Sequence, residues 1–299
     1  APQLRANALK SAGVTDAQWG DLNGDGALDL IVAGEWMPLT VFLNRSGTLE
    51  RAEPQALGLD HSSGWWQSLE LTDLNGDGAL DFVAGNHGLN SRFRASPQEP
   101  VELWAGDVNR DGQIEQIFAS YNEGTGPYPV ALRQNLIQHL PHLRARYPTF
   151  ADYAGKTVAE LFGQELEGAE HYRAEQLASI VGWNDGEGSF RVDSLPFPAQ
   201  LAPVYAIHIA DLDGDEVPEI LLGGNLEAAS PQAGSYDASY GVLLRQDSTG
   251  SYRDVPPYES GFRSAGEVRA IETLQHGGRP LVLVARNNKP VQIFELLHR

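Results

Sequence analysis

One nine-residue acidic stretch recurs along this chain and limits the folds open to it more than any other feature. Residues 21–29 and residues 73–81 both read DLNGDGALD. Residues 107–115 (DVNRDGQIE) and 211–219 (DLDGDEVPE) keep oxygen-bearing side chains at positions one, three, five and nine. A single copy is also typical of a surface turn rich in Asn and Gly. Four copies in one register instead indicate loops with a common chemical role.

Alternating carboxylates and amides can converge on one point in a tight loop. Two carboxylates held about 4 Å apart without a counter-ion repel by roughly 4 kcal/mol at an effective dielectric constant near 20. A cation removes that repulsion, and ligands made only of oxygen favour Ca²⁺ over zinc or a strictly octahedral Mg²⁺. We therefore expect up to four Ca²⁺ ions, held by side chains at positions one, three, five and nine and by the backbone carbonyl of position seven. The expected ligands are Asp21, Asn23, Asp25, Ala27, Asp29, Asp73, Asn75, Asp77, Ala79, Asp81, Asp107, Asn109, Asp111, Gln113, Glu115, Asp211, Asp213, Asp215, Val217 and Glu219.

The segments beside the loops decide which kind of calcium motif this is. An EF-hand needs a Glu at position twelve and a helix on each side. Position twelve is Val32 in the first copy and Ala84 in the second. Residues 28–33 and 69–73 are short apolar or alternating runs, which are typical of strands. The loops are therefore predicted to join strands.

The pattern D-x-[DN]-x-D-G-x-x-[DE] between strands resembles the FG-GAP/VCBS repeat of integrin-alpha-type β-propellers and of bacterial secreted VCBS-repeat proteins. The resemblance covers most of the chain except one insertion. It implies an all-β propeller of four-stranded antiparallel blades, with the calcium loops on one face joining the first two strands of a blade.

Strand patterns along the chain favour about five such blades in a single domain, residues 1–299. The last unit begins near residue 267, has Gln275–Pro280 in place of an acidic loop and lacks an outer strand. Residues 3–9 form a lone strand pattern that could supply it. The alternative is that the chain is part of a larger propeller.

The loops start 52, 34 and 104 positions apart, and the long gap contains residues 132–176, which lack strand periodicity. Residues 135–146 have helical apolar spacing, and Thr157 with Glu160 forms a capping-box pattern. We expect a helical insertion of two or three short helices on the rim or over one face of the third blade. Residues 179–183 and 189–193 are expected to resume that blade. The insertion is either an inert appendage or a partner surface or lid.

Composition narrows the functional classes. The net charge of −19 argues against nucleic acid as a partner, and thirteen of the acidic residues are expected Ca²⁺ ligands. The absence of cysteine excludes disulfides, thiol catalysis and thiolate metal sites. No apolar run is long enough to span a membrane. The chain begins at Ala1 without a signal-peptide pattern, which fits a processed segment, and calcium sites of modest affinity favour a secreted, periplasmic or cell-surface protein.

Turns at the end of the blades opposite the acidic loops are rich in Trp, Asn, His and Tyr. Aromatic faces stack on sugar CH groups while amides bond the hydroxyls, so this composition suits a polyhydroxylated ligand. The alternative is that these side chains pack between blades and cap turns. The expected ligand-binding residues are Trp36, Trp65, Trp66, Asn86, His87, Tyr121, Asn122, Asn225, Arg286 and Asn287.

These features favour a calcium-binding module with an extracellular protein or glycan as its ligand. One alternative is a calcium-dependent polysaccharide lyase, in which His61, His87 and Tyr121 act while Ca²⁺ or Arg286 neutralises a uronate. Another is an architectural part of a larger secreted polypeptide or assembly. No catalytic residues are assigned, because the sequence contains no G-x-S-x-G, H-E-x-x-H or P-loop pattern.

The four loops are not expected to bind equally. Position six is Gly26 in the first copy and Gly78 in the second, and glycine readily adopts the positive φ of a sharp turn. The fourth copy has Glu216 there, with Pro218 close by, although Asp213 adds a carboxylate. We expect backbone strain to make the fourth site distorted or weaker.

Overall fold

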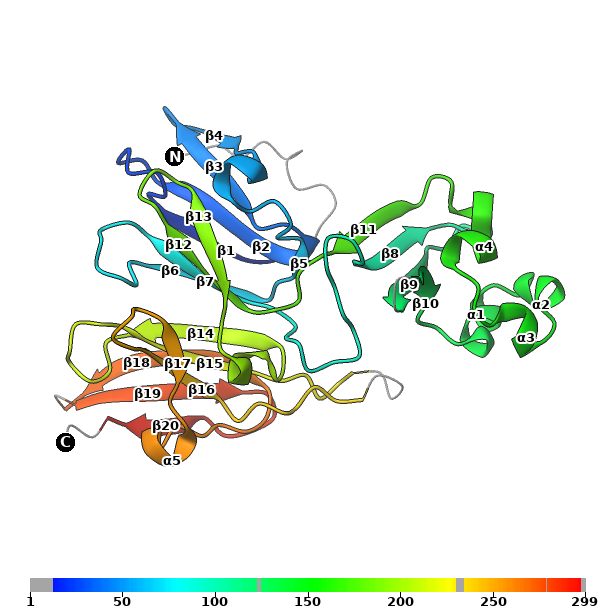
Figure 1. Cartoon of the computed structure of the whole chain (residues 1–299). Helices are drawn as coiled ribbons and strands as arrows, with labels where there is room; N and C mark the ends of the chain where they lie inside the picture. Colours follow the sequence, from blue (N-terminus) through cyan, green and yellow to red (C-terminus); the bar gives the residue numbers. More distant parts are fainter. Residues whose placement is uncertain (1–12, 123–124, 230–233, 278, 297–299) are drawn as a thin grey trace. The chain divides into compact units, whose positions relative to one another are not determined.

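The computed structural model describes residues 13–122, 125–229, 234–277 and 279–296 (Figure 1). The fold is mostly β, with five antiparallel sheets and a small helical segment. The described residues form two compact units, of which one is the continuous segment Arg92–Gln176 and the other consists of the residues on both sides of it. The lone strand expected over residues 3–9 lies outside the described residues. No helix of the described chain is long and apolar enough to cross a membrane.

The first sheet has the strand order β1-β2-β3-β4, and a short strand, β5, also pairs with β2. β2 is apolar over Leu30–Ala33 and buried on both faces, which requires packing partners above and below the sheet. The strands are β1 (Gly13–Gly20), β2 (Asp29–Met37), β3 (Thr40–Arg45), β4 (Thr48–Arg51) and β5 (Gly64–Trp65), and a 3-10 turn, η1 (Pro54–Leu57), follows β4.

The second sheet has the order β6-β7-β12-β13, so its third strand comes from beyond the Arg92–Gln176 unit. The prediction that residues 179–183 and 189–193 complete the third blade is therefore wrong. The physical reason is a close fit: a Cβ at Gly182 would lie 2.1 Å from the Phe82 ring, so only glycine lets β12 pass over that ring. The elements are β6 (Ser68–Thr72), β7 (Asp81–Gly85), β12 (Ile180–Asn184), β13 (Phe190–Ser194) and η3 (Phe197–Gln200).

The chain leaves and re-enters this sheet at neighbouring points. The Gly88 N–H donates to the Leu177 carbonyl over 2.8 Å, although the 85 residues of the other unit lie between them in the sequence. The acidic loops at Asp73 and Asp211 are 138 positions apart, and 53 once those 85 residues are subtracted. That spacing nearly equals the 52 positions between the first two loops. Arg92–Gln176 therefore interrupts an otherwise regular series.

The third sheet has four strands and the fourth has three. Among the described residues the last sheet has no outer strand, which agrees with the sequence pattern. The third sheet contains β14 (Val204–Ala210), β15 (Glu219–Gly224), β16 (Val242–Gln246) and β17 (Tyr252–Asp254), followed by α5 (Pro257–Ser260). The fourth contains β18 (Val268–His276), β19 (Arg279–Arg286) and β20 (Gln292–Glu295).

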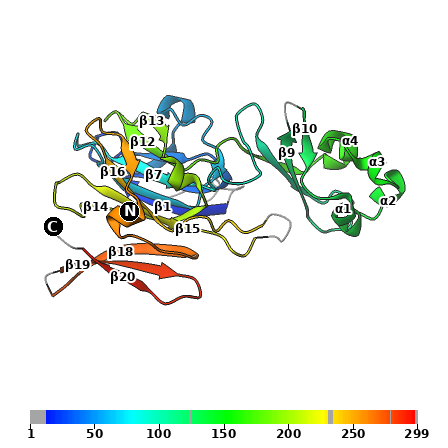
Figure 2. The same ribbon diagram turned by 60° about the horizontal axis from the view of Figure 1, so that its bottom comes forward.

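These four sheets stack in sequence order through their first strands: β1 lies beside β6, β6 beside β14, and β14 beside β18 (Figures 1 and 2). A separate apolar cluster fills each contact. Ile31 and Phe82 lie in the first, Ile207 and Ile220 in the second, and Val282 in the third. Since each inner sheet face is apolar and buried, the hydrophobic effect drives the stacking.

The Arg92–Gln176 unit has its own core. Its sheet has the order β10-β9-β8-β11, and short helices pack on it. Leu136, Leu140, Leu161 and Phe162 from the helical segment share a buried cluster with Ile117 of the sheet. The elements are β8 (Val101–Gly106), β9 (Glu115–Asn122), β10 (Thr125–Pro129), α1 (Arg133–His139), α2 (Leu143–Arg146), α3 (Phe150–Tyr153), α4 (Val158–Phe162), η2 (Gly163–Leu166) and β11 (Glu170–Ala174).

The helical prediction for this segment is confirmed in outline. The Thr157 hydroxyl accepts from the Glu160 N–H and the Glu160 carboxylate accepts from the Thr157 N–H, which is the predicted capping box. The run over residues 135–146 divides into α1 and α2 because Pro141 cannot donate a helical hydrogen bond. The helices cover the sheet that carries the third acidic loop, as one of the expected placements required. The single-domain assignment for residues 1–299 stays a prediction.

Candidate metal sites

Each acidic loop begins immediately after one strand and ends on the first residue of the next. Asp21–Asp29 joins β1 to β2, Asp73–Asp81 joins β6 to β7, and Asp211–Glu219 joins β14 to β15. Asp107–Glu115 joins β8 to β9 in the Arg92–Gln176 unit. The strand–loop–strand prediction is therefore confirmed at all four places.

Hydrogen bonds within the loop turn its polar side chains inward. In the first loop, the Asp21 carboxylate accepts from the N–H groups of Asp25 (3.1 Å) and Gly26 (2.8 Å). The Asp25 carboxylate accepts from the Ala27 N–H over 2.9 Å. The second and third loops repeat these bonds, and the fourth keeps the bonds to positions six and seven. Four stretches with three different sequences thus adopt closely similar conformations, which follows from their shared polar positions.

The carboxylate at position nine holds the loop to the sheet through hydrogen bonds from backbone N–H groups. Asp29 is fully buried, and its two oxygens accept from the N–H groups of Leu22 (3.0 Å) and Asn44 (2.7 Å). Asp81 makes the same pair of bonds with Leu74 and Asn184. Burial raises the pKa of Asp29, while these N–H groups act in the opposite direction. A buried carboxylate with acidic neighbours is the electrostatic setting that a bound cation stabilises.

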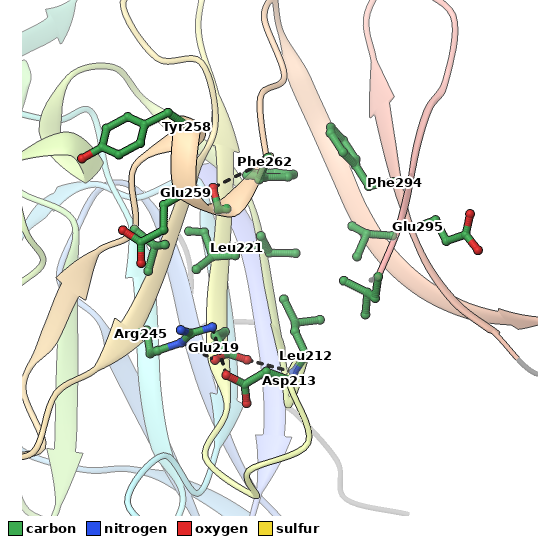
Figure 3. A pocket seen from close by; sticks show the side chains of 16 residues that line it. Leu212, Asp213, Glu219, Leu221, Arg245, Tyr258, Glu259, Phe262, Phe294 and Glu295 are labelled. Atoms are coloured by element: carbon green, nitrogen blue, oxygen red, sulfur yellow. Dashed lines mark hydrogen bonds and ion pairs between the residues drawn. The ribbon is translucent and has the colours of Figure 1, made fainter. Parts of the chain in front are cut away.

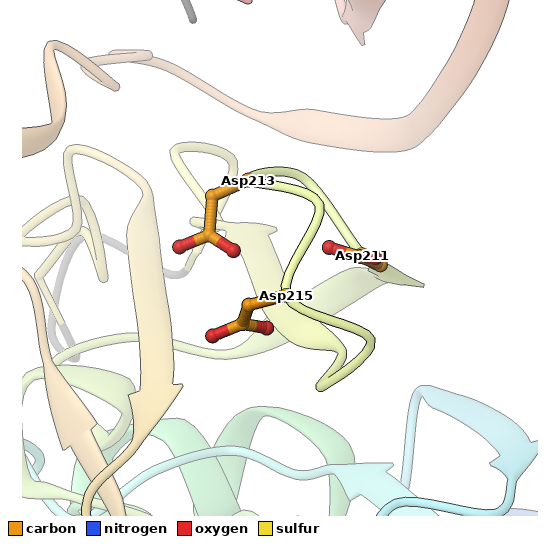
Figure 4. A group of neighbouring side chains, drawn as sticks. All are labelled: Asp211, Asp213 and Asp215. Carbon is orange, nitrogen blue, oxygen red and sulfur yellow. The ribbon is translucent and has the colours of Figure 1, made fainter. Parts of the chain in front are cut away.

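The fourth loop brings three carboxylates together. Oxygens of Asp211, Asp213 and Asp215 all lie within 4.8 Å of one another, and the three side chains are exposed (Figure 4). Oxygen ligands lie about 2.4 Å from a Ca²⁺ ion, so two of them on opposite sides are separated by about 4.8 Å. The triad therefore fits a hard cation of this size and could hold one.

Arg245 of β16 is a partner that the sequence patterns did not reveal. Its Nη2 lies 2.9 Å from Asp213 Oδ2, and its Nε donates to Glu219 Oε1 over 2.9 Å. The first three loops have Asn where the fourth has Asp213. Arg245 thus offsets the extra negative charge of the fourth loop and competes with a cation for two of its expected ligands.

Backbone conformation separates the loops as expected. Position six has a positive φ in all four: 84° at Gly26, 89° at Gly78, 90° at Gly112 and 70° at Glu216. Of the four residues at position six, Glu216 alone carries a side chain in this left-handed conformation, which costs roughly 1–2 kcal/mol for an L-residue. In the third loop, Arg110 at position four has the same kind of strain, with a φ of 62°. The predicted carbonyl ligands at position seven remain predictions.

An aromatic row lies where β2, β5 and β7 end away from the acidic loops. The ring of Trp65 packs edge-on against Trp36 (5.1 Å between centroids) and against His87 (5.0 Å). His87 packs in turn against Tyr236, at 4.6 Å, a residue that the sequence analysis did not select. Burial lowers the pKa of His87 to about 4, so its imidazole is neutral at pH 7. We call Trp36, Trp65, His87 and Tyr236 the aromatic row.

Three of the expected ligand-binding residues instead hold the fold. Trp66 is fully buried in the first core cluster, and its indole N–H donates to the Ser62 carbonyl. Asn86 is also fully buried, and its Oδ1 accepts from the N–H of Trp65. Asn225 is 1% exposed, and its amide donates to the carbonyls of Ser239 and Gly266. For these residues the structure supports the packing and turn-capping alternative.

Two more of the expected residues hydrogen-bond to neighbouring segments. Arg286 donates to the carbonyls of Ala265 and Pro290, and Asn287 donates to Glu267. Tyr121 and Asn122 belong to the Arg92–Gln176 unit, and their part in a ligand-binding face stays a prediction.

One comparison with known protein families agrees with the loop pattern. Residues 21–84 match the family model described as the FG-GAP-like repeat, and this range contains the first two acidic loops. No curated protein matches the chain. A similar solved structure is the V. cholerae biofilm matrix protein Bap1, with 16% identity and a TM-score of 0.20. The match covers 86% of this chain and 40% of Bap1, so the chain spans less than half of that protein's length.

Proposed function

From the FG-GAP-like repeat that the chain contains, we propose that this protein is a calcium-binding module of the β-propeller type that acts outside the cytosol. The single observation that carries this proposal is the conformation that the four acidic loops share. Within the fourth loop, three carboxylates converge. Up to four Ca²⁺ ions would be held by the residues at positions one, three, five and nine. Bound Ca²⁺ would offset carboxylate repulsion and so stabilise each hairpin.

The stacked sheets support the propeller part of the proposal. Their first strands lie side by side in sequence order, as the inner strands of adjacent blades do. The four sheets outside Arg92–Gln176 would be consecutive blades, and Arg92–Gln176 would be an insertion into the second. We propose that the blades close into a ring, either within this chain or together with further blades.

We assign the ligand-binding role to the aromatic row, and a carbohydrate is the ligand class that its chemistry favours. Trp36 and Tyr236 are half-buried, and the surface that their rings expose suits stacking on the CH groups of sugar rings. A polysaccharide lyase is less well supported. Burial raises the pKa of Tyr121, which opposes the phenolate form that a base requires. The architectural role stays an alternative.

Thermal unfolding tests the calcium part. Protein freed of metal should melt at a higher temperature after Ca²⁺ is added, because a ligand at a hundredfold excess over its Kd adds about 2.7 kcal/mol per site. Mg²⁺ at the same concentration should give a smaller shift, since it demands tighter octahedral geometry. Identical melting temperatures with Ca²⁺ and with EGTA would contradict the proposal.

Glycan arrays and a uronate-polymer cleavage assay test the ligand part together. Binding without cleavage is the expected result, and Trp36→Ala should weaken it, because the substitution removes an exposed ring of the row. Trp183→Ala is the matched control, since Trp183 stacks on Tyr252 (6.1 Å) outside the row. Cleavage of a uronate polymer would favour the lyase. Absence of both activities would leave the architectural alternative.

A further inference from the structure

The fourth sheet stops one strand short of the other three. Each of the first three sheets has an outermost strand, β4, β13 or β17, whereas β20 has no strand on its outer side among the described residues. In this fold the outermost strand takes part in the contact between neighbouring sheets, as β13 and β17 show.

β13 and β17 each bring an aromatic side chain into the contact with the preceding sheet. Phe190, the first residue of β13, is buried in the first core cluster and packs against Phe82 at 5.1 Å. Tyr252, the first residue of β17, stacks on Trp183 and donates to the Pro218 carbonyl. Both aromatics stand in the order Gly-Ser-aromatic-Arg, at residues 188–191 and 250–253. The outermost strand therefore fills the gap between neighbouring sheets.

Two glycines show where such a strand would run beside the fourth sheet. After β4, the turn η1 ends at Gly58, with a φ of 69°; after β17, α5 ends at Gly261, with a φ of 71°. A Cβ at Gly58 would lie 2.3 Å from the Phe190 carbonyl oxygen, so the outermost strand of the next sheet passes directly against this glycine. At Gly261, no heavy atom of the described residues lies within 4 Å of the same position.

A cavity of about 790 Å³ occupies this place, between the third and fourth sheets (Figure 3). Its apolar lining includes Leu221, Leu243, Val255, Phe262, Val282 and Phe294. Phe262 and Phe294 face the cavity from different elements, and Glu259 and Glu295 lie at its border. The cavity is large enough for bulky side chains, and its lining is the kind that buries them favourably.

The outer edge of β20 has backbone groups in position to pair. The Leu296 N–H donates to the Pro280 carbonyl, and Phe294 lies opposite Val282, so alternate residues of β20 face β19. By the alternation of an antiparallel ladder, the N–H and C=O groups of Ile293 and Glu295 then face outward. An exposed edge of this kind is a template for an added strand.

We propose that the β20 edge and the adjoining cavity form an acceptor site for an extended strand from another polypeptide segment, with the pattern aromatic-Arg-apolar. This goes beyond calcium binding, but the cavity also borders Asp213 and Glu219 of the fourth acidic loop, so the test holds the Ca²⁺ concentration constant. In the second sheet, Phe190 lies opposite Asn184 and Arg191 lies opposite Trp183. In the fourth sheet, Leu296, just after β20, corresponds to Asn184, and Glu295 of β20 corresponds to Trp183.

The incoming aromatic residue would therefore lie opposite Leu296 and enter the cavity. The following Arg would lie opposite Glu295, whose Oε1 accepts from Arg279 over 2.7 Å, and it would add a second pair of opposite charge there, which is favourable across strands. The chain's own β13 satisfies both requirements. Its sequence is thus the most direct probe of the site.

The test is a titration of the full chain, at constant Ca²⁺, with the peptide acetyl-Gly-Ser-Phe-Arg-Val-Asp-Ser-amide, the sequence of residues 188–194. We expect saturable binding by NMR or fluorescence anisotropy below about 2 mM. The peptide with Ala in place of Phe should bind about tenfold more weakly, because it leaves the cavity unfilled. Equal binding of the two peptides, or no binding of either, would overturn the proposal.

Substitutions in the protein separate the site from the fold. Gly261→Asn places a side chain on the path of the incoming strand, and Asn tolerates a left-handed backbone, so the melting temperature should change by less than about 2 °C while peptide binding is lost. Gly58→Asn should lower the melting temperature markedly, because its Cβ meets Phe190. Ile293→Pro should also abolish binding, since it removes an outward N–H from an edge strand. Unchanged binding by Gly261→Asn and Ile293→Pro would overturn the proposal.

Residues 1–12 of the chain itself are the competing occupant, and a double variant tests them. Leu4→Glu with Leu9→Glu makes this segment unsuitable for an apolar cavity. If the peptide bound this variant but not the parent chain, the occupant would be the chain's own N-terminal segment, and a strand from elsewhere would be ruled out. Equal binding by parent and variant is the result that the proposal expects.

Discussion

The side-chain amide of Asn184 donates to the backbone carbonyl of Leu22, a residue 162 positions earlier, over 2.9 Å. Asn184 ends the third strand of the second sheet, and Leu22 is position two of the first acidic loop. The same relation recurs one sheet later, where Gln246 donates to the carbonyl of Leu74 over 2.6 Å. The second and third sheets thus each hold the acidic loop of the sheet before them.

Replacing Asn184 with Ala should lower the free energy of unfolding by about 2 kcal/mol, because it leaves the buried carbonyl of Leu22 and the half-buried carbonyl of Leu80 without that donor. Asn44→Ala is the matched control. Asn44 stands at the same place in the first sheet and donates to Leu28 at an exposed position, so its loss should cost less. Urea denaturation measures both values. Equal costs would show that the contact to the preceding loop adds nothing.

Exchanging the residues at loop position six should change calcium affinity in opposite directions. Glu216→Gly relieves left-handed strain in the fourth loop, and Gly26→Glu introduces it into the first, so total affinity should rise in one variant and fall in the other. Calorimetric titration with Ca²⁺ measures the change. Glu216→Gln removes the charge but keeps the strain, and it should not reproduce the gain. If it did, charge rather than backbone conformation would set the ranking.

Stability should fall as the pH rises through the range set by Glu70. Burial, followed by the nearby charges of Asp16 and Glu272, raises the pKa of Glu70 from 4.5 to about 7. The folded chain therefore binds this proton more tightly than the unfolded chain, and the contribution is lost between about pH 4.5 and pH 7. Glu70→Gln should raise the melting temperature more at pH 8 than at pH 5. The comparison is made in EGTA, and a gain that is independent of pH would contradict it.

Removing Arg92–Gln176 should leave the other unit folded. The ends that remain are already close, since Gly88 and Leu177 are hydrogen-bonded, so a short Gly/Ser link suffices. We expect a β-rich circular dichroism spectrum and the loss of one calcium site, because the third loop lies in the deleted unit. Removing only residues 134–175 should be more damaging, since it deletes β11 and exposes Ile117 in the remaining sheet. Global unfolding of the first variant would mean that the two units fold only together.

The sequence by itself determined the acidic loops and the strands beside them. A nine-residue loop is closed by bonds between residues two to seven positions apart, as between Asp21 and Gly26 or Leu22 and Asp29. Such local bonds depend on residue types and spacing, which the chain shows directly. The capping box at Thr157 and the strain at Glu216 were predictable for the same reason.

Only the tertiary structure decided which strands pair and which side chains meet. Residues 180–184 have the pattern of a strand, but nothing in that pattern tells β7 from β9 as the partner; the fit of Gly182 over Phe82 does. Arg245 and Tyr236 likewise acquire their roles from contacts with distant residues. Apolar periodicity specifies that a face is buried and leaves open against what, because the hydrophobic effect is not directional. Shape and hydrogen bonding between distant segments settle that choice.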